Sequence, residues 1–124
     1  MPDTRQIAIA DDDDSVRTAL GRLCSAHGLV VHMFGCAQQL IDTLQGGARP
    51  DCLVLDVQMP GVGGIDVQAW LRQHRVDIPT VMITGRDDEQ VRLRSLALGA
   101  SAYFCKPVDV TVLLGAIQHA IRTR

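Results

Sequence analysis

The chain has 124 residues and a formal net charge of −2, and 47% of its residues are hydrophobic while only 3% are aromatic. This length suits one domain with its own core, which must be aliphatic. The charge excludes a general basic surface for nucleic acid, and no apolar run is long enough to span a bilayer. The first residues lack the apolar stretch of a signal peptide. The four scattered cysteines predict reduced, mostly buried thiols in a cytoplasmic protein, without zinc or disulfides.

Short apolar runs alternate with segments of helical periodicity along the whole chain. The predicted strands cover residues 7–10, part of 29–34, 52–56, 80–84 and 102–105. The predicted helices cover 16–24, 37–44, 65–74, 87–100 and 110–121. Five strands that alternate with five helices indicate an α/β fold, with a parallel sheet covered on both faces and right-handed crossovers.

The fourth predicted helix has two apolar faces. Its main apolar face is expected to contain Leu93, Leu96, Ala97 and Ala100. Val91 and Leu98 fall outside that face. These two residues therefore predict either a second, partner-facing surface or ordinary packing.

Polar residues follow four of the five predicted strands. They are Asp11–Asp12, Asp56, Thr84 and Lys106. Because parallel strands share one carboxyl edge, we expect these groups to face one crevice, where open α/β sheets bind ligands. Each group alone is a weak indication, but four at consecutive strands are a strong one.

The run of four acids after the first strand divides into two parts. Asp13, Asp14 and Ser15 are expected to begin the first helix, where carboxylates and hydroxyls cap free N–H groups. Asp11 and Asp12 are expected to meet Asp56 and bind a hard divalent cation, with the oxygen ligands that Mg²⁺ prefers. The spacing does not fit an EF-hand loop.

The combined group suits phosphoryl transfer. A carboxylate at Asp56 can act as a nucleophile and form an acyl phosphate. Lys106 supplies a compact positive charge and Thr84 a hydroxyl donor for phosphoryl oxygens. Without metal, the clustered carboxylates should raise one another's pKa values, so that binding depends on pH and on Mg²⁺.

Four segments carry a resemblance to a known family along essentially the whole chain. They are Ile-Ala-Asp-Asp-Asp-Asp-Ser-Val-Arg, Leu-Asp-Val-Gln-Met-Pro-Gly-Val-Gly-Gly, Met-Ile-Thr-Gly and Gly-Ala-Ser-Ala-Tyr-Phe-Cys-Lys-Pro. With them the chain resembles the receiver domains of two-component response regulators, in particular those of FixJ-type transcriptional regulators. The resemblance implies a flavodoxin-like, doubly wound (βα)5 fold with strand order 2-1-3-4-5.

The resemblance also implies a metal and phosphoryl site. Asp56 would accept the phosphoryl group. Asp12, Asp56 and the backbone carbonyl of Gln58 would bind Mg²⁺ or Mn²⁺ directly, and Asp11 would act largely through a metal-bound water. Lys106 would bind the phosphoryl group.

Three further features follow from the resemblance. Thr84 and Tyr103 resemble the family's switch pair, in which the hydroxyl moves toward the phosphate and the ring turns inward. Gln58 and Arg86 occupy positions that influence water attack, and Arg86 is either a shield that slows hydrolysis or an ordinary surface arginine. The Lys106–Pro107 bond is expected to be cis.

The expected partner is a sensor histidine kinase or a phosphotransfer protein. The readout surface would be the fourth helix, fifth strand and fifth helix, where Val91, Leu98 and Tyr103 are candidates for a phosphorylation-dependent homodimer. We expect one receiver domain over residues 1–124, either alone or as the N-terminal part of a longer regulator. DNA would be contacted only through an output domain outside this chain, and no membrane contact is expected. The domain would catalyse only its own phosphorylation and dephosphorylation.

Three other functions fit the sequence less well. A phosphatase of the haloacid-dehalogenase-like class needs an acid two residues after its nucleophile, where this chain has Gln58. A nucleotide or flavin site needs a glycine-rich phosphate cradle, but the first turn is acidic. A phosphorylation-independent interaction module has no need for the complete set of Asp, Thr and Lys residues.

Overall fold

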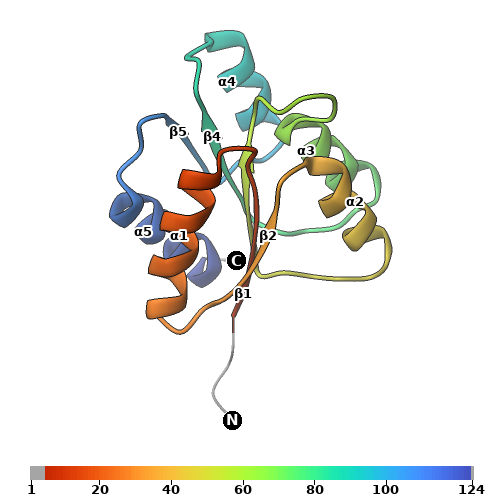
Figure 1. The fold of residues 1–124 in the computed structure, drawn as a ribbon. Coiled ribbons are helices and arrows are strands. Elements are labelled where there is room, and N and C mark those ends of the chain that lie inside the picture. The colour runs from red at the N-terminus through yellow and green to blue at the C-terminus, as the bar shows by residue number, and fades with distance from the viewer. Residues whose placement is uncertain (1–4, 124) are drawn as a thin grey trace.

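The computed structural model describes residues 5–123, which form a five-stranded parallel sheet and five helices (Figure 1). The strand order is β2-β1-β3-β4-β5, which confirms the predicted order. In chain order the elements are β1 (Gln6–Ala10), α1 (Asp14–Ala26), β2 (Val30–Phe34), α2 (Ala37–Gln45), β3 (Cys52–Asp56), α3 (Gly64–Gln73), β4 (Thr80–Thr84), α4 (Glu89–Ala97), β5 (Ala102–Cys105) and α5 (Val110–Arg122). No helix among these residues is both long and apolar enough to cross a membrane.

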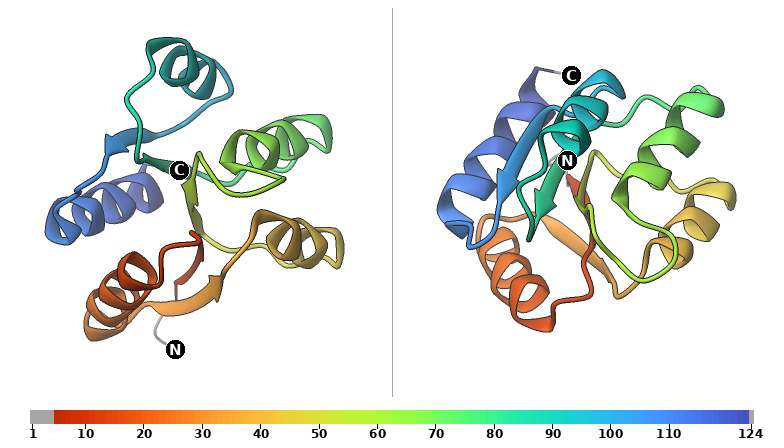
Figure 2. Two further views of the ribbon diagram at one scale, coloured as in Figure 1. Left: turned by 45° about the horizontal axis from the view of Figure 1, so that its top comes forward. Right: turned by 90° about the horizontal axis from the view of Figure 1, so that it is seen from above.

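Helices cover both faces of the sheet, and each face has its own apolar core. In Figures 1 and 2, α1 and α5 lie on one face, and α2, α3 and α4 lie on the other. Alternate residues of β1 point to opposite faces, so that Ile7 and Ile9 pack with α1 and α5 while Ala8 and Ala10 pack with α2 and α3. Every residue of β3 and β4 is buried, as expected for central strands of a parallel sheet.

Aspartate side chains cap the N-termini of three helices, and the first of these caps lies in the acidic run that the sequence predicts to begin a helix. The side chain of Asp13 accepts from Ser15 N at 2.9 Å and caps α1. Asp88 caps α4 and Asp109 caps α5 in the same way. Each carboxylate satisfies N–H groups that have no partner within the helix.

The prediction that Leu93 and Leu96 lie on the core-facing side of α4 is wrong. Leu93 and Leu96 are 53% and 41% exposed, whereas Val91 and Leu98 are only partly exposed. Ser95 is the one buried residue of α4, and its carbonyl accepts from Nε2 of Gln68 on α3 at 3.0 Å. The helix therefore turns Val91, Ser95 and Leu98 toward the protein and leaves two leucines in solvent. Hydrophobic periodicity could not predict this orientation, because a buried amide contact holds the helix instead of an apolar stripe.

The prediction that most cysteines are buried is only half right. The four cysteines form no disulfide bond among the described residues, and Cys24 and Cys52 are buried. Cys36 is partly exposed, and Cys105 at the end of β5 is exposed.

Two glycines after β3 allow the chain to turn tightly behind Asp56. A Cβ atom on Gly63 would lie 2.5 Å from the carbonyl oxygen of Val57. A Cβ atom on Gly64 would lie 2.6 Å from the carbonyl oxygen of Asp56. Both obstacles are backbone atoms, which cannot move aside as a flexible side chain can, so the turn that positions Asp56 requires glycine.

We predict that Gly64→Ala lowers the free energy of unfolding by about 1–3 kcal/mol, because the added methyl group overlaps backbone next to Asp56. Gly115→Ala is the matched control. It lies within α5 with no atom within 4 Å of the new Cβ, and it should stabilise the protein by about 0.5–1 kcal/mol. Urea denaturation measures both. Equal effects of the two substitutions would contradict the proposed close approach.

Candidate functional site

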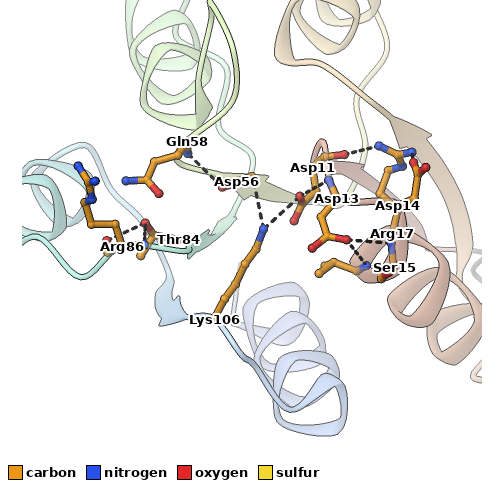
Figure 3. A network of polar contacts seen from close by, with 11 residues as sticks. Asp11, Asp13, Asp14, Ser15, Arg17, Asp56, Gln58, Thr84, Arg86 and Lys106 are labelled. Carbon is orange, nitrogen blue, oxygen red and sulfur yellow. Dashed lines mark hydrogen bonds and ion pairs between the residues drawn. The ribbon is translucent and has the colours of Figure 1, made fainter.

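Asp56 is the last residue of β3 and lies at the carboxyl edge of the sheet (Figure 3). It is only 2% exposed. Its Oδ1 atom accepts from Gln58 N at 3.0 Å, and its Oδ2 atom accepts from Lys106 Nζ at 3.2 Å. A buried carboxylate is costly unless it is paired, so these two donors make its ionised form tolerable.

Asp11 directly follows β1 and is fully buried. Its Oδ1 atom accepts from Asp13 N at 2.9 Å and from Lys106 Nζ at 3.2 Å. Among the described residues, its buried Oδ2 atom has no hydrogen-bond partner. A buried acceptor without a donor is costly, so this oxygen is suited to a cation or a metal-bound water.

Lys106 joins the two carboxylates. It follows β5, and its backbone N–H donates to the carbonyl oxygen of Thr84 at 2.7 Å. This hydrogen bond continues the pairing of β5 with β4. The Lys106–Pro107 bond is cis, as the resemblance implies. Burial opposes the charge of this ammonium, but the carboxylates of Asp11 and Asp56 outweigh that effect and raise the pKa of Lys106. The side chain therefore acts as a fixed cation at the sheet edge.

The acids of β1 and β3 are close enough to share a cation. Asp11, Asp12 and Asp56 each offer a carboxylate oxygen, and these oxygens lie within 4.8 Å of one another. Asp12 is exposed, whereas the other two acids are buried. An all-oxygen donor set with one side open to solvent fits Mg²⁺, which retains several of its waters. The structure thus brings together the acids that the sequence predicts to converge.

A protein-family model described as "Response regulator receiver domain" matches residues 7–118. The chain belongs to this family.

The relatives of this receiver domain are longer proteins. Response regulator protein TodT of Pseudomonas putida strain F1 is 37% identical over 116 residues, which cover 94% of this chain and 51% of TodT. Nodulation protein W of Bradyrhizobium diazoefficiens is 35% identical, and the match covers 92% of this chain and 50% of Nodulation protein W. The chain spans about half the length of the curated relatives it matches.

Solved structures agree with this assignment. Response regulator StyR is 33% identical with a TM-score of 0.87, and the match covers 98% of this chain and 61% of StyR. FixJ-N is 28% identical with a TM-score of 0.86, and the match covers 100% of this chain and 98% of FixJ-N. A CheY-like receiver from Methanospirillum hungatei has a TM-score of 0.90 at 22% identity, covering 98% and 96%, and supports the fold alone.

The predicted switch residues of this receiver domain lie on neighbouring strands, but the structure does not join them to the carboxylates. Thr84 Oγ1 donates to Arg86 O at 2.9 Å and accepts from Arg86 N at 3.2 Å, so the hydroxyl is held by the loop after β4 (Figure 3). The hydroxyl of Tyr103 is buried without a partner among the described residues, and burial raises its pKa. A change of partner at Thr84 therefore needs a rearrangement of this loop.

Gln58 follows β3 and Arg86 follows β4, so both lie at the ends of neighbouring strands. Both side chains are exposed. Gln58 Oε1 lies 3.8 Å from where a Cβ atom on Gly85 would be, which places it beside the loop after β4. The influence of these two residues on phosphoryl lifetime stays a prediction.

The sequence did not single out one contact of the acidic turn. Arg17 Nη1 donates to Asp11 O at 2.5 Å, and Arg17 Nη2 pairs with the Asp14 carboxylate. The spacing of Asp14 and Arg17 is typical of an ion pair on a helix. The carbonyl contact has no such pattern, because it depends on how the turn folds back over α1.

Burial is the largest cause of the raised pKa of Asp56, which is about 6. The Gln58 N–H lowers this pKa, the charge of Asp11 raises it, and the Lys106 contact lowers it. From the sequence, the expected rise in pKa comes from mutual repulsion of the clustered acids. Desolvation is the larger effect, since Asp56 is almost fully enclosed.

Without metal, we predict that ionised Asp56 destabilises the fold. Its folded-state pKa lies above the ordinary value of 3.8, so the folded protein binds the proton more tightly, and stability falls as pH rises from about 4 through about 6. In EDTA, Asp56→Asn should therefore be more stable than wild type by about 1–3 kcal/mol at pH 7.5.

This difference should shrink as the pH falls toward 4, and Mg²⁺ should raise the stability of wild type but hardly that of the variant. Thermal denaturation at several pH values measures both effects. A difference that does not change with pH would contradict the raised pKa.

Proposed function

We propose that this receiver domain is a phospho-acceptor switch, in which Asp56 takes a phosphoryl group from the phosphohistidine of a sensor histidine kinase or a phosphotransfer protein. The observation that carries the proposal is the position of Lys106 Nζ, 3.2 Å from carboxylate oxygens of both Asp11 and Asp56. This lysine already contacts both the nucleophile and its neighbouring acid. Its ammonium group can therefore move to the new negative charge when a phosphoryl group is added to Asp56.

Asp56 is the nucleophile of the proposed reaction. One of its carboxylate oxygens attacks phosphorus, the P–N bond of the phosphohistidine breaks, and the released imidazole nitrogen takes a proton from water. The Gln58 N–H stays on the other carboxylate oxygen and holds the side chain in one orientation. Lys106 then binds an oxygen of the phosphoryl group.

The cation of this reaction is Mg²⁺ or Mn²⁺. Asp12, Asp56 and the carbonyl of Gln58 would bind it, and Asp11 would hold one of its waters. The orphaned Oδ2 atom of Asp11 and the 4.8 Å grouping of the acids support this assignment. When bound, such a cation neutralises negative charge on the phosphoryl oxygens.

Phosphorylation would move Thr84 and Tyr103. Three new acceptor oxygens compete with Arg86 O for the Thr84 hydroxyl, and its departure frees the loop before α4. The ring of Tyr103 follows into the space beside Thr84. The chain then catalyses no reaction other than its own phosphorylation and dephosphorylation, and Arg86 and Gln58 set how quickly water reaches the phosphorus.

The output surface of the switch would be α4, β5 and α5, used for a phosphorylation-dependent homodimer. The apolar side chains exposed on these elements support this surface, and they are Leu93, Leu96 and Val112 rather than Val91 and Leu98. The domain works in the cytoplasm without membrane contact, and DNA is reached only through an output domain outside this chain.

The test is incubation with acetyl phosphate or phosphoramidate and Mg²⁺, followed by intact-mass measurement of wild type and Asp56→Asn. We predict a hydroxylamine-labile gain of one phosphoryl group in wild type and none in the variant. The same samples time the loss of the adduct, which should be faster in Arg86→Ala if the arginine shields phosphorus. Size-exclusion chromatography of the samples reports dimerisation.

Two outcomes would contradict the proposal. Equal labelling of wild type and Asp56→Asn would place the phosphoryl group elsewhere. No adduct with either donor, despite Mg²⁺ binding, would favour a phosphorylation-independent interaction module.

A further inference from the structure

Arg17 reaches from α1 back to the strand end that carries the acids (Figure 3). Its side chain is 20% exposed, its Nη1 atom donates to Asp11 O at 2.5 Å, and its Nη2 atom pairs with Asp14. A Cβ atom on Gly35 would lie 3.4 Å from Nη1, so the glycine after β2 leaves space for the guanidinium. The arginine is thus enclosed between two turns rather than extended into solvent.

The contact lies on the peptide that joins Asp11 and Asp12, the two acids that follow β1. The Asp11 carbonyl and the Asp12 N–H belong to one rigid peptide plane. Asp11 is already fixed, because its N–H donates to Phe34 O at 3.2 Å and its side chain is held by Lys106. Asp12 is exposed, and among the described residues no hydrogen bond or ion pair of its side chain is found. The orientation of the peptide plane is therefore what directs the Asp12 carboxylate.

We propose that Arg17 is a positioning residue for the cation site: by binding Asp11 O it holds the Asp11–Asp12 peptide in the orientation that directs the Asp12 carboxylate toward Asp11 and Asp56. The proposal rests on the cation site of the proposed function. It gives a role to the arginine that ends the first of the segments shared with receiver domains, a residue outside the set of acids, threonine and lysine.

Position and charge have opposite effects here, which makes the proposal testable. A positive side chain beside the acids repels a second cation, so loss of its charge alone would strengthen Mg²⁺ binding. Loss of the carbonyl contact would weaken Mg²⁺ binding, because Asp12 would no longer be pre-oriented. Arg17→Lys keeps the charge but loses the planar fork that reaches two oxygens at once. Arg17→Met removes both.

The experiment is calorimetric titration of the protein with MgCl₂, in the absence of any phosphoryl donor. Arg17→Lys and Arg17→Met should each bind Mg²⁺ about tenfold more weakly than wild type, as is typical when support of a metal ligand is removed. Both variants should keep the thermal midpoint of wild type in EDTA to within a few degrees, while the rise in midpoint caused by Mg²⁺ becomes smaller. A side chain with a merely structural role would lower the midpoint in EDTA and leave the Mg²⁺ affinity unchanged.

Two controls lie on the same helix. Arg22 is exposed and makes no hydrogen bond or ion pair with the described residues, so Arg22→Lys and Arg22→Met should bind Mg²⁺ like wild type. Asp14→Asn removes the exposed ion pair but keeps the carbonyl contact, and it should change the affinity by less than about twofold.

Wild-type affinity in Arg17→Lys, or tighter binding in Arg17→Met, would overturn the positioning role. Either result would leave the phospho-acceptor function intact, provided wild type binds Mg²⁺ and is labelled at Asp56. Absence of Mg²⁺ binding in wild type would instead overturn the cation site itself, and with it both proposals.

Discussion

One ammonium group holds together two carboxylates that the fold buries on different strands. Asp11 and Asp56 are 0% and 2% exposed, and Lys106 Nζ lies 3.2 Å from each. Loss of the ammonium would leave two buried carboxylates without a counter-charge, which is strongly destabilising. The arrangement is therefore poor as a structural device and good as a binding site, because any ligand that supplies positive charge relieves the acids. In the proposed function Mg²⁺ would supply that charge, and a phosphoryl group would then supply new acceptors for the lysine.

The weak attachment of α4 complements this site. Thr84 is bound to the loop that leads into α4, and α4 contacts the protein through a buried serine while its leucines face solvent. A two-state element needs about 5.5 kcal/mol of differential interaction to move from 1:99 to 99:1. A few charge-assisted hydrogen bonds to a phosphoryl group supply energy of this order. Because α4 buries little apolar surface, a differential interaction energy of this size is enough to change its position.

Much of the fold and site could be predicted from the sequence, since alternating apolar runs and helical segments fix a parallel sheet, and a parallel sheet brings strand-end groups to one edge. Asp11, Asp56 and Lys106 meet for that reason. The side of α4 that faces the protein could not be predicted, because hydrophobic periodicity does not detect the buried contact between Gln68 and the Ser95 carbonyl. The Arg17 contact was equally hidden, since its acceptor is a backbone carbonyl, which every residue possesses.

A crystal structure of the protein with Mg²⁺ and beryllium fluoride, a stand-in for the phosphoryl group, would show directly whether Asp56 is the acceptor. We predict the beryllium fluoride adduct on Asp56, with Lys106 and Thr84 in contact with its fluorines. We also predict Mg²⁺ about 2.0–2.1 Å from oxygens of Asp12, Asp56 and the Gln58 carbonyl. An adduct on another residue, or a Lys106 ammonium that stays between Asp11 and Asp56 without contacting the adduct, would contradict these predictions.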